Sequence, residues 1–160
     1  CDLWLAPDQT VHLLWTERAI DERLREKFFP EAKQSHALYY AVVRDGKIVR
    51  RRALVESVEG KPGIIASAGR FQVTPDNRLF AIFYASGTGD DGKRISENRS
   101  VEIRADGSAT APMRLPLTKP FVNYFTATVR AGSPPSGTLE MLGQREGTPM
   151  TISYARVRLF

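Results

Sequence analysis

The stretch "TPDNRLFAIFY", from Thr74 to Tyr84, joins a turn to a strand that is apolar at almost every position. Pro75 presets φ and Asp76 can cap the turn with its own side chain, so a tight turn is expected here. Successive side chains of a strand point to opposite faces, which gives two apolar sets: Leu79, Ala81 and Phe83 on one face, and Phe80, Ile82 and Tyr84 on the other. A strand of this kind belongs in a sheet that is covered on both faces.

An earlier copy of this hairpin occurs near the start of the chain. Residues 3–16, "LWLAPDQTVHLLWT", align with residues 71–84, "FQVTPDNRLFAIFY", and Pro7-Asp8 falls on Pro75-Asp76. Each copy reads as an apolar strand, a polar turn and a second apolar strand, which is the pattern of a β-hairpin. The chain is therefore built from an internal repeat.

A second type of hairpin follows each copy of the first. Residues 38–54, "LYYAVVRDGKIVRRRAL", turn at Asp45-Gly46, and residues 100–115, "SVEIRADGSATAPMRL", turn at Asp106-Gly107. Asp-Gly between alternating runs is a strong hairpin signal, because glycine adopts positive φ at little cost. One repeat thus contains four consecutive antiparallel strands.

A third repeat begins near Phe121, with a turn over residues 132–137, and its fourth strand is missing. The sequence therefore predicts eleven strands in an all-β fold, a β-propeller-like arc of about three four-stranded antiparallel blades. A β-sandwich of irregular hairpins is the alternative. As a single domain, the expected blades span residues 1–57, residues 64–117 and, incompletely, residues 121–160.

One segment breaks the strand pattern. Between residues 17 and 36, three apolar residues recur at helical spacing among charged neighbours, namely Ile20, Leu24 and Phe28. Pro30 should end the helix. We expect one short inserted helix near Asp21–Phe29, with its apolar stripe on the edge of a sheet.

Composition limits the function classes. The 160 residues include 23 Lys and Arg against 18 Asp and Glu, so the net charge is +5, which suits an acidic partner or simply a solvated basic surface. No run approaches the roughly 18 apolar residues of a membrane span. Phosphate-loop, zinc-ligand and nucleic-acid motifs are absent from the sequence, so we expect no cofactor, metal or nucleic acid. Cys1 is the only cysteine, which excludes an internal disulfide.

Four segments together resemble one family: "APDQTVHLLWTE", "TPDNRLFAIFY", "YYAVVRDGKIV" and "ENRSVEIRADGS". The chain is similar in these segments to secreted bacterial sialidase-like β-propeller proteins that carry neuraminidase-type repeats. Of that family's Asp-box, Ser-x-Asp-x-Gly-x-Thr-Trp, the stretch "RADGSATA" keeps only the Asp-Gly turn. The resemblance implies a carbohydrate-active protein in an extracellular or periplasmic location.

Two classes of function are open. The first is a carbohydrate-active module that acts on or binds an acidic polysaccharide or glycoside; as an enzyme it would be a glycoside hydrolase or a polysaccharide lyase. The second is a non-catalytic protein-interaction scaffold of propeller type. Common propellers have about four to eight blades, so the expected partners also include the remaining blades of a longer chain or a second copy.

A ligand is expected at the rim with the longer connections, because function usually lies on loops held by a rigid scaffold. These connections are residues 17–36, 58–69, 86–98, 119–123 and 144–149. The catalytic candidates are His36 with Tyr124 as base and acid, and Glu17 with Glu97 as a carboxylate pair. Arginine grips a carboxylate bidentately, so the candidate binding residues are Arg18, Arg94, Asn98, Arg99, Asn123 and Thr126. Solvated loops and an ordinary β-branched strand residue are the structural alternatives.

Overall fold

The structure is a computed structural model that describes residues 2–127, 133–148 and 150–159. These residues form three antiparallel sheets, in which consecutive strands are neighbours. Sheet A contains β1 (Asp2–Leu5), β2 (Val11–Arg18), β3 (Ser35–Arg44) and β4 (Lys47–Val58). Sheet B contains β5 (Gly63–Val73), β6 (Leu79–Thr88), β7 (Arg94–Ile103) and β8 (Met113–Arg114). Sheet C contains β9 (Phe121–Thr126), β10 (Thr138–Arg145) and β11 (Ile152–Arg158).

The all-β class and the three antiparallel sheets are confirmed, and the described residues form the eleven strands that were predicted. Both hairpins of a repeat lie in one sheet. The Asp-Gly turn between β3 and β4 forms as expected, since Asp45 and Gly46 both adopt positive φ, at 50° and 71°. The fourth strand of sheet B is shorter than predicted: after the Asp106-Gly107 turn, only Met113 and Arg114 form a strand, β8.

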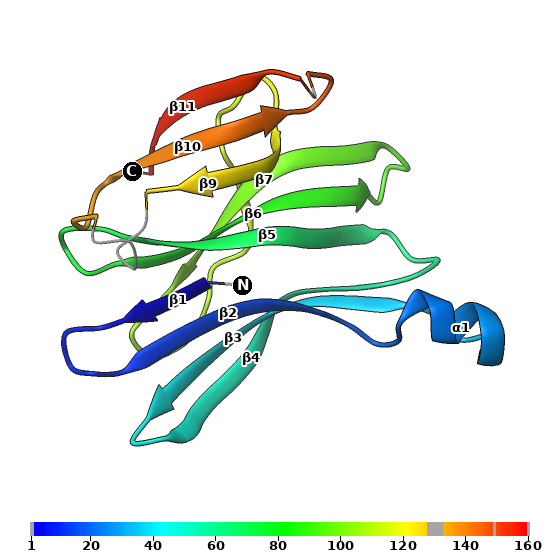
Figure 1. Cartoon of the computed structure of the whole chain (residues 1–160), viewed down its shortest axis with the longest axis horizontal. Coiled ribbons are helices and arrows are strands. Elements are labelled where there is room, and N and C mark those ends of the chain that lie inside the picture. The colour runs from blue at the N-terminus through cyan, green and yellow to red at the C-terminus, as the bar shows by residue number, and fades with distance from the viewer. Residues whose placement is uncertain (1, 128–132, 149, 160) are drawn as a thin grey trace.

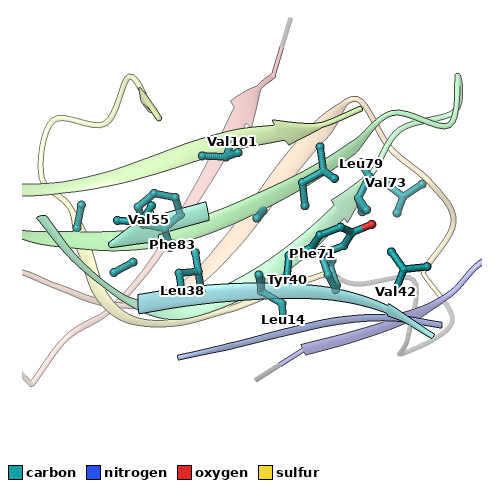
Figure 2. Packing of buried hydrophobic residues seen from close by; sticks show 14 residues of the cluster. Leu14, Leu38, Tyr40, Val42, Val55, Phe71, Val73, Leu79, Phe83 and Val101 are labelled. Atoms are coloured by element: carbon teal, nitrogen blue, oxygen red, sulfur yellow. The ribbon is translucent and has the colours of Figure 1, made fainter. Parts of the chain in front are cut away.

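Sheet B lies between the other two sheets, as the alternation in β6 predicts. Leu79, Ala81 and Phe83 are buried in a cluster shared with sheet A, which Figure 2 shows. Phe80 and Ile82, the intervening residues, are buried in a second cluster shared with sheet C. Both faces of β6 are apolar, and each is therefore covered by one of the neighbouring sheets.

The first strands of the three sheets lie next to one another, since β5 contacts both β1 and β9 (Figure 1). Buried polar side chains join the sheets there and at β7. The Asp2 carboxylate accepts a hydrogen bond from the Phe71 backbone N–H at 2.8 Å. The Asn98 amide accepts from the Phe121 N–H at 2.6 Å and donates to its carbonyl at 2.9 Å. These bonds fix the spacing between sheets.

Helix α1 (Glu22–Phe28) forms where the sequence predicts it, capped by Asp21, whose side chain accepts from the Arg23 N–H. Its expected packing is wrong: Leu24 and Phe28 are 50% and 57% exposed. Polar contacts hold the insertion instead, with Arg25 2.7 Å from a Glu59 carboxylate oxygen. Within the part of the chain that is described, no helix has the length and apolar character needed to cross a membrane.

Two connections that were expected to be long are short. The strands β4 and β5 are separated by residues 59–62, and β6 and β7 by residues 89–93. The reason is that the strand pairing of β6 with β5 and with β7 extends into the segments that were expected to be loops. Gly63 pairs with Thr88, and Thr88 pairs with Arg94. The rim with the longer connections therefore carries less loop than the sequence suggested.

Candidate functional site

A hollow of about 660 Å³ lies between sheets A and B, and we call it the rim hollow. Its lining includes residues of the β1–β2 and β5–β6 turns, and Figure 1 shows these turns and the β3–β4 turn at the same end of the molecule. Two other hollows measure about 310 and 290 Å³. The side chains of the rim hollow that bear chemistry are Trp4, Asp8, His12, Tyr40, Arg44, Arg50 and Arg104.

A histidine–tyrosine pair lies in the rim hollow. His12 Nδ1 and the Tyr40 hydroxyl oxygen are 2.8 Å apart, and the Trp4 ring lies 4.7 Å from the His12 ring. The Tyr40 ring packs edge-on against Phe71 in the core between sheets A and B, and this contact holds the tyrosine of the pair in place. Figure 2 shows the Tyr40 hydroxyl at the end of the cluster near Val42 and Leu79, which also line the rim hollow.

The surroundings fix the protonation of this pair at neutral pH. Burial lowers the pKa of His12, although the Asp8 carboxylate opposes that shift. Burial also raises the pKa of Tyr40 to about 12. The imidazole is therefore neutral and the phenol protonated near pH 7. Among the described residues, the second ring nitrogen of His12 has no hydrogen-bond partner.

Three arginines line the rim hollow, against one carboxylate. Asp8 lies 3.5 Å from Arg44, and Arg104 donates to the Ser108 hydroxyl at 3.3 Å. Arg50 forms no ion pair with a described residue, and its charge acts on both His12 and Tyr40. The rim hollow therefore has a positive potential that favours an anion.

Arg50 reaches from sheet A to the turn that follows β7 in sheet B. Its guanidinium lies against Gly107, where any Cβ would overlap it. Gly107 has φ of 78°, which favours glycine, whereas the Arg50 guanidinium is the end of a flexible side chain that a Cβ would displace. The neighbouring Arg52 donates to the Gly107 carbonyl at 2.7 Å. The Asp106-Gly107 turn, which the sequence identified as a hairpin signal, thus also holds an arginine over the rim hollow.

Sequence reasoning missed this site because it favoured the opposite rim. Two signals were present. His12 shares a strand face with the core residue Leu14, and the run Arg50–Arg52 puts two arginines on one face of β4. Polar residues at core-facing positions near the end of a strand cannot pack dry against the facing sheet, so the sheets separate there.

Of the residues predicted for the opposite rim, Arg18 and His36 come together. They are directly paired between β2 and β3. Glu17 points to the other face of sheet A, where it bonds Arg51 at 2.9 Å. His36 lines the 310 Å³ hollow beside α1, which is separate from the rim hollow. Glu17 and Arg18 line the 290 Å³ hollow together, so these three residues do not share one pocket.

The predicted catalytic pairs are not assembled. Tyr124 is buried between sheets B and C, and burial raises the pKa of its hydroxyl. His36 is on sheet A, so sheet B separates the two side chains. Glu97 bonds Arg99 at 3.0 Å on sheet B, whereas Glu17 is on the outer face of sheet A, so this carboxylate pair does not meet either.

Apart from Arg18 on sheet A, the predicted binding residues are distributed over sheets B and C. Asn98 is buried and holds the Phe121 backbone, which is a structural role. Arg94 lies 2.6 Å from Glu146, and Asn123 is exposed on sheet C. The Thr126 hydroxyl is buried and has no hydrogen-bond partner within the described part of the chain. Arg130, which the sequence predicts at the rim with the tight turns and away from the ligand, lies outside the described residues, as does Cys1.

Within the described ranges, no three His, Cys, Asp or Glu side chains gather in a way that would hold a metal ion. The chemistry of the rim hollow is that of arginines, an aromatic ring and a histidine–tyrosine pair. No family model, curated protein or solved structure matches this chain.

Proposed function

We propose that the chain is a carbohydrate-active module that binds an acidic saccharide in the rim hollow. The observation that carries this proposal is the group of three arginines around a hollow that also contains Trp4 and the His12–Tyr40 pair. Arginine suits a planar carboxylate, because two parallel N–H groups match its two oxygens. The apolar ring of Trp4 suits the face of a sugar, and polar groups beside it suit the hydroxyls.

The proposal includes a β-propeller-like arrangement, in which each sheet is one blade. Three features support it: the four-strand repeat, the stacking of sheet B between sheets A and C, and the contacts among the first strands β1, β5 and β9. The resemblance to secreted sialidase-like propellers supports an extracellular or periplasmic location within the same proposal.

The test is a calorimetric titration with oligosaccharides that contain uronate or sialate, and with a neutral oligosaccharide of similar length. We expect binding of an acidic saccharide, weakened about 10- to 100-fold in Arg50→Ala, since a hydrogen bond to a charged group contributes about 1.5–3 kcal/mol. Binding should also weaken as salt is raised.

Arg51→Ala is the matched control. Arg51 is the next residue of β4, but its guanidinium lies over the Tyr39 ring on the outer face of sheet A. It should leave saccharide affinity unchanged. Equal losses in both variants, or an affinity for the neutral oligosaccharide equal to that for the acidic ones, would contradict a carboxylate site in the rim hollow.

A second candidate function is a protein-interaction scaffold, which a different surface supports. Phe125, Leu142 and Tyr154 are paired side by side across sheet C, and they are 69%, 50% and 58% exposed. An exposed apolar row of this kind is typical of an interaction surface. Absence of saccharide binding, together with an association that Leu142→Glu abolishes, would favour this candidate.

A further inference from the structure

The two nitrogens of His12 have different surroundings. Nδ1 is 2.8 Å from the Tyr40 hydroxyl, whereas Nε2 has no hydrogen-bond partner among the residues that the structure describes. When Nδ1–H donates to the Tyr40 oxygen, the lone pair of the neutral ring lies on Nε2. The contact lets either group donate, and in the tautomer that carries its hydrogen on Nδ1 the Nε2 atom can accept a proton from a ligand.

The carboxylates of the rim hollow do not suit the common two-carboxyl routes of glycoside hydrolysis. Hydrolysis by the common routes uses two carboxyl groups on either side of the scissile bond. Asp8 is the one carboxylate among the described residues that line the rim hollow, and it accepts from the Thr10 hydroxyl at 2.8 Å and lies beside Arg44. A second carboxyl group for an acid–base pair is not present in that lining.

The remaining groups suit a different reaction. In a uronate, the carboxylate is next to C5, and the C5 proton becomes removable once that carboxylate is held by cationic hydrogen-bond donors. Arg50 is positioned for this by its packing on Gly107, and Arg104 lines the same wall. The rim hollow thus combines a base with a site for the charge that develops when the proton leaves.

Resting on the proposed function, we infer that the rim hollow cleaves a 4-linked uronate polysaccharide by β-elimination, with His12 as the base and Tyr40 as its positioning residue. His12 Nε2 takes the proton from C5, and the electron pair of that C–H bond forms the C4=C5 double bond. The C4–O bond breaks, and the leaving oxygen keeps its electron pair. That oxygen then takes the proton from Nε2–H, which restores the neutral imidazole without any co-reactant.

The reaction is tested by the ultraviolet absorbance of the new double bond, with polygalacturonate, alginate and hyaluronan as substrates. His12→Asn keeps a polar atom near Tyr40 but has no Nε2. We expect it to lower kcat at least about 100-fold, the usual contribution of a general base, while saccharide affinity persists. The matched control is His36→Asn, which changes the other histidine, in the separate hollow beside α1, and should leave kcat unchanged.

Tyr40→Phe tests the positioning role. It should lower kcat more than it changes KM, and it should move the acid limb of the kcat/KM profile to lower pH, because the imidazolium loses its acceptor. The charged and titratable groups around His12 are Asp8, Arg44, Arg50 and Arg104, and these stay in place in this variant. Loss of activity with an unchanged pH profile, alongside a lowered Tm, would show that Tyr40 has only a structural role.

The outcomes separate this inference from the function on which it rests. Binding that depends on Arg50, without an unsaturated product from any of the three polymers, overturns the elimination and leaves the saccharide site standing. Absence of binding overturns both. A product that forms equally well in His12→Asn overturns the assignment of the base.

Discussion

Sheet B packs against sheet A on one face and against sheet C on the other, and the two interfaces end differently at the rim that carries the β5–β6 turn. Toward sheet C, Arg78 bonds both oxygens of the Glu102 carboxylate at 2.9 Å and covers the Phe80 ring. Toward sheet A, Arg50 forms no ion pair with a described residue, although its charge acts on Asp106, and it lines the rim hollow. An arginine that is paired closes an interface, whereas one that is left unpaired leaves a place for an external anion.

The middle of each interface is a core of buried hydrophobic residues. Substitutions there should have the largest effect on the free energy of unfolding. Phe83 is fully buried between sheets A and B. Phe83→Ala should lower the free energy of unfolding by about 3–5 kcal/mol, because it removes a large apolar side chain and leaves a cavity. Urea denaturation measures this. Phe125→Ala, at an exposed position on sheet C, is the control and should change stability by less than about 0.5 kcal/mol.

Polar groups inside the interface with sheet C should have unequal effects. Asn98→Ala leaves the buried N–H and carbonyl of Phe121 unsatisfied, which should cost about 2–4 kcal/mol. Tyr124→Phe removes a buried hydroxyl for which the described residues provide no hydrogen-bond partner, so it should be neutral or slightly stabilising. Thermal unfolding of the two variants compares them. Similar destabilisation by both would mean that the interface depends on packing alone.

The stability that the Arg78–Glu102 ion pair contributes should depend on pH. The Arg78 guanidinium lowers the pKa of Glu102, so folding stabilises the charged carboxylate. This contribution is present above the ordinary glutamate pKa, and it is lost as pH falls through the lowered value in the folded state. Glu102→Gln should therefore destabilise the protein at neutral pH, by about 1 kcal/mol or less since the pair is partly exposed, and the difference from the natural protein should vanish in acid. A difference that persists in acid would contradict the ion-pair explanation.

The smallest expected effect is on self-association, through the exposed outer face of sheet C. The row of Phe125, Leu142 and Tyr154 on sheet C should promote self-association at high concentration, because it leaves apolar area in water. Light scattering should show a mass above that of one chain, and Leu142→Glu should reduce it without changing Tm. A monomer at every concentration tested would show that the outer face of sheet C is not a sheet-packing surface for a second copy.

Much of the fold follows from local patterns. The alternation from Leu79 to Phe83 predicts two covered faces, and both clusters contain the expected residues. The turn at Asp45-Gly46 and the helix over Glu22–Phe28 depend on neighbouring residues only, and both form as predicted. Asn98 shows the limit of such patterns: it was expected to bind a ligand, and its partner is the backbone of Phe121 in another sheet.

By itself, the sequence determined the strands, their turns and the faces that are apolar, because those properties depend on residues a few positions apart. Only the tertiary structure decided where a hollow lies and which side chains share it. His12, Tyr40, Arg50 and Arg104 come from four different strands or turns, and they meet because two sheets separate at one rim. The polar residues at the ends of these strands favour that separation, but which residues face one another across it depends on how whole sheets pack, through contacts between distant parts of the chain.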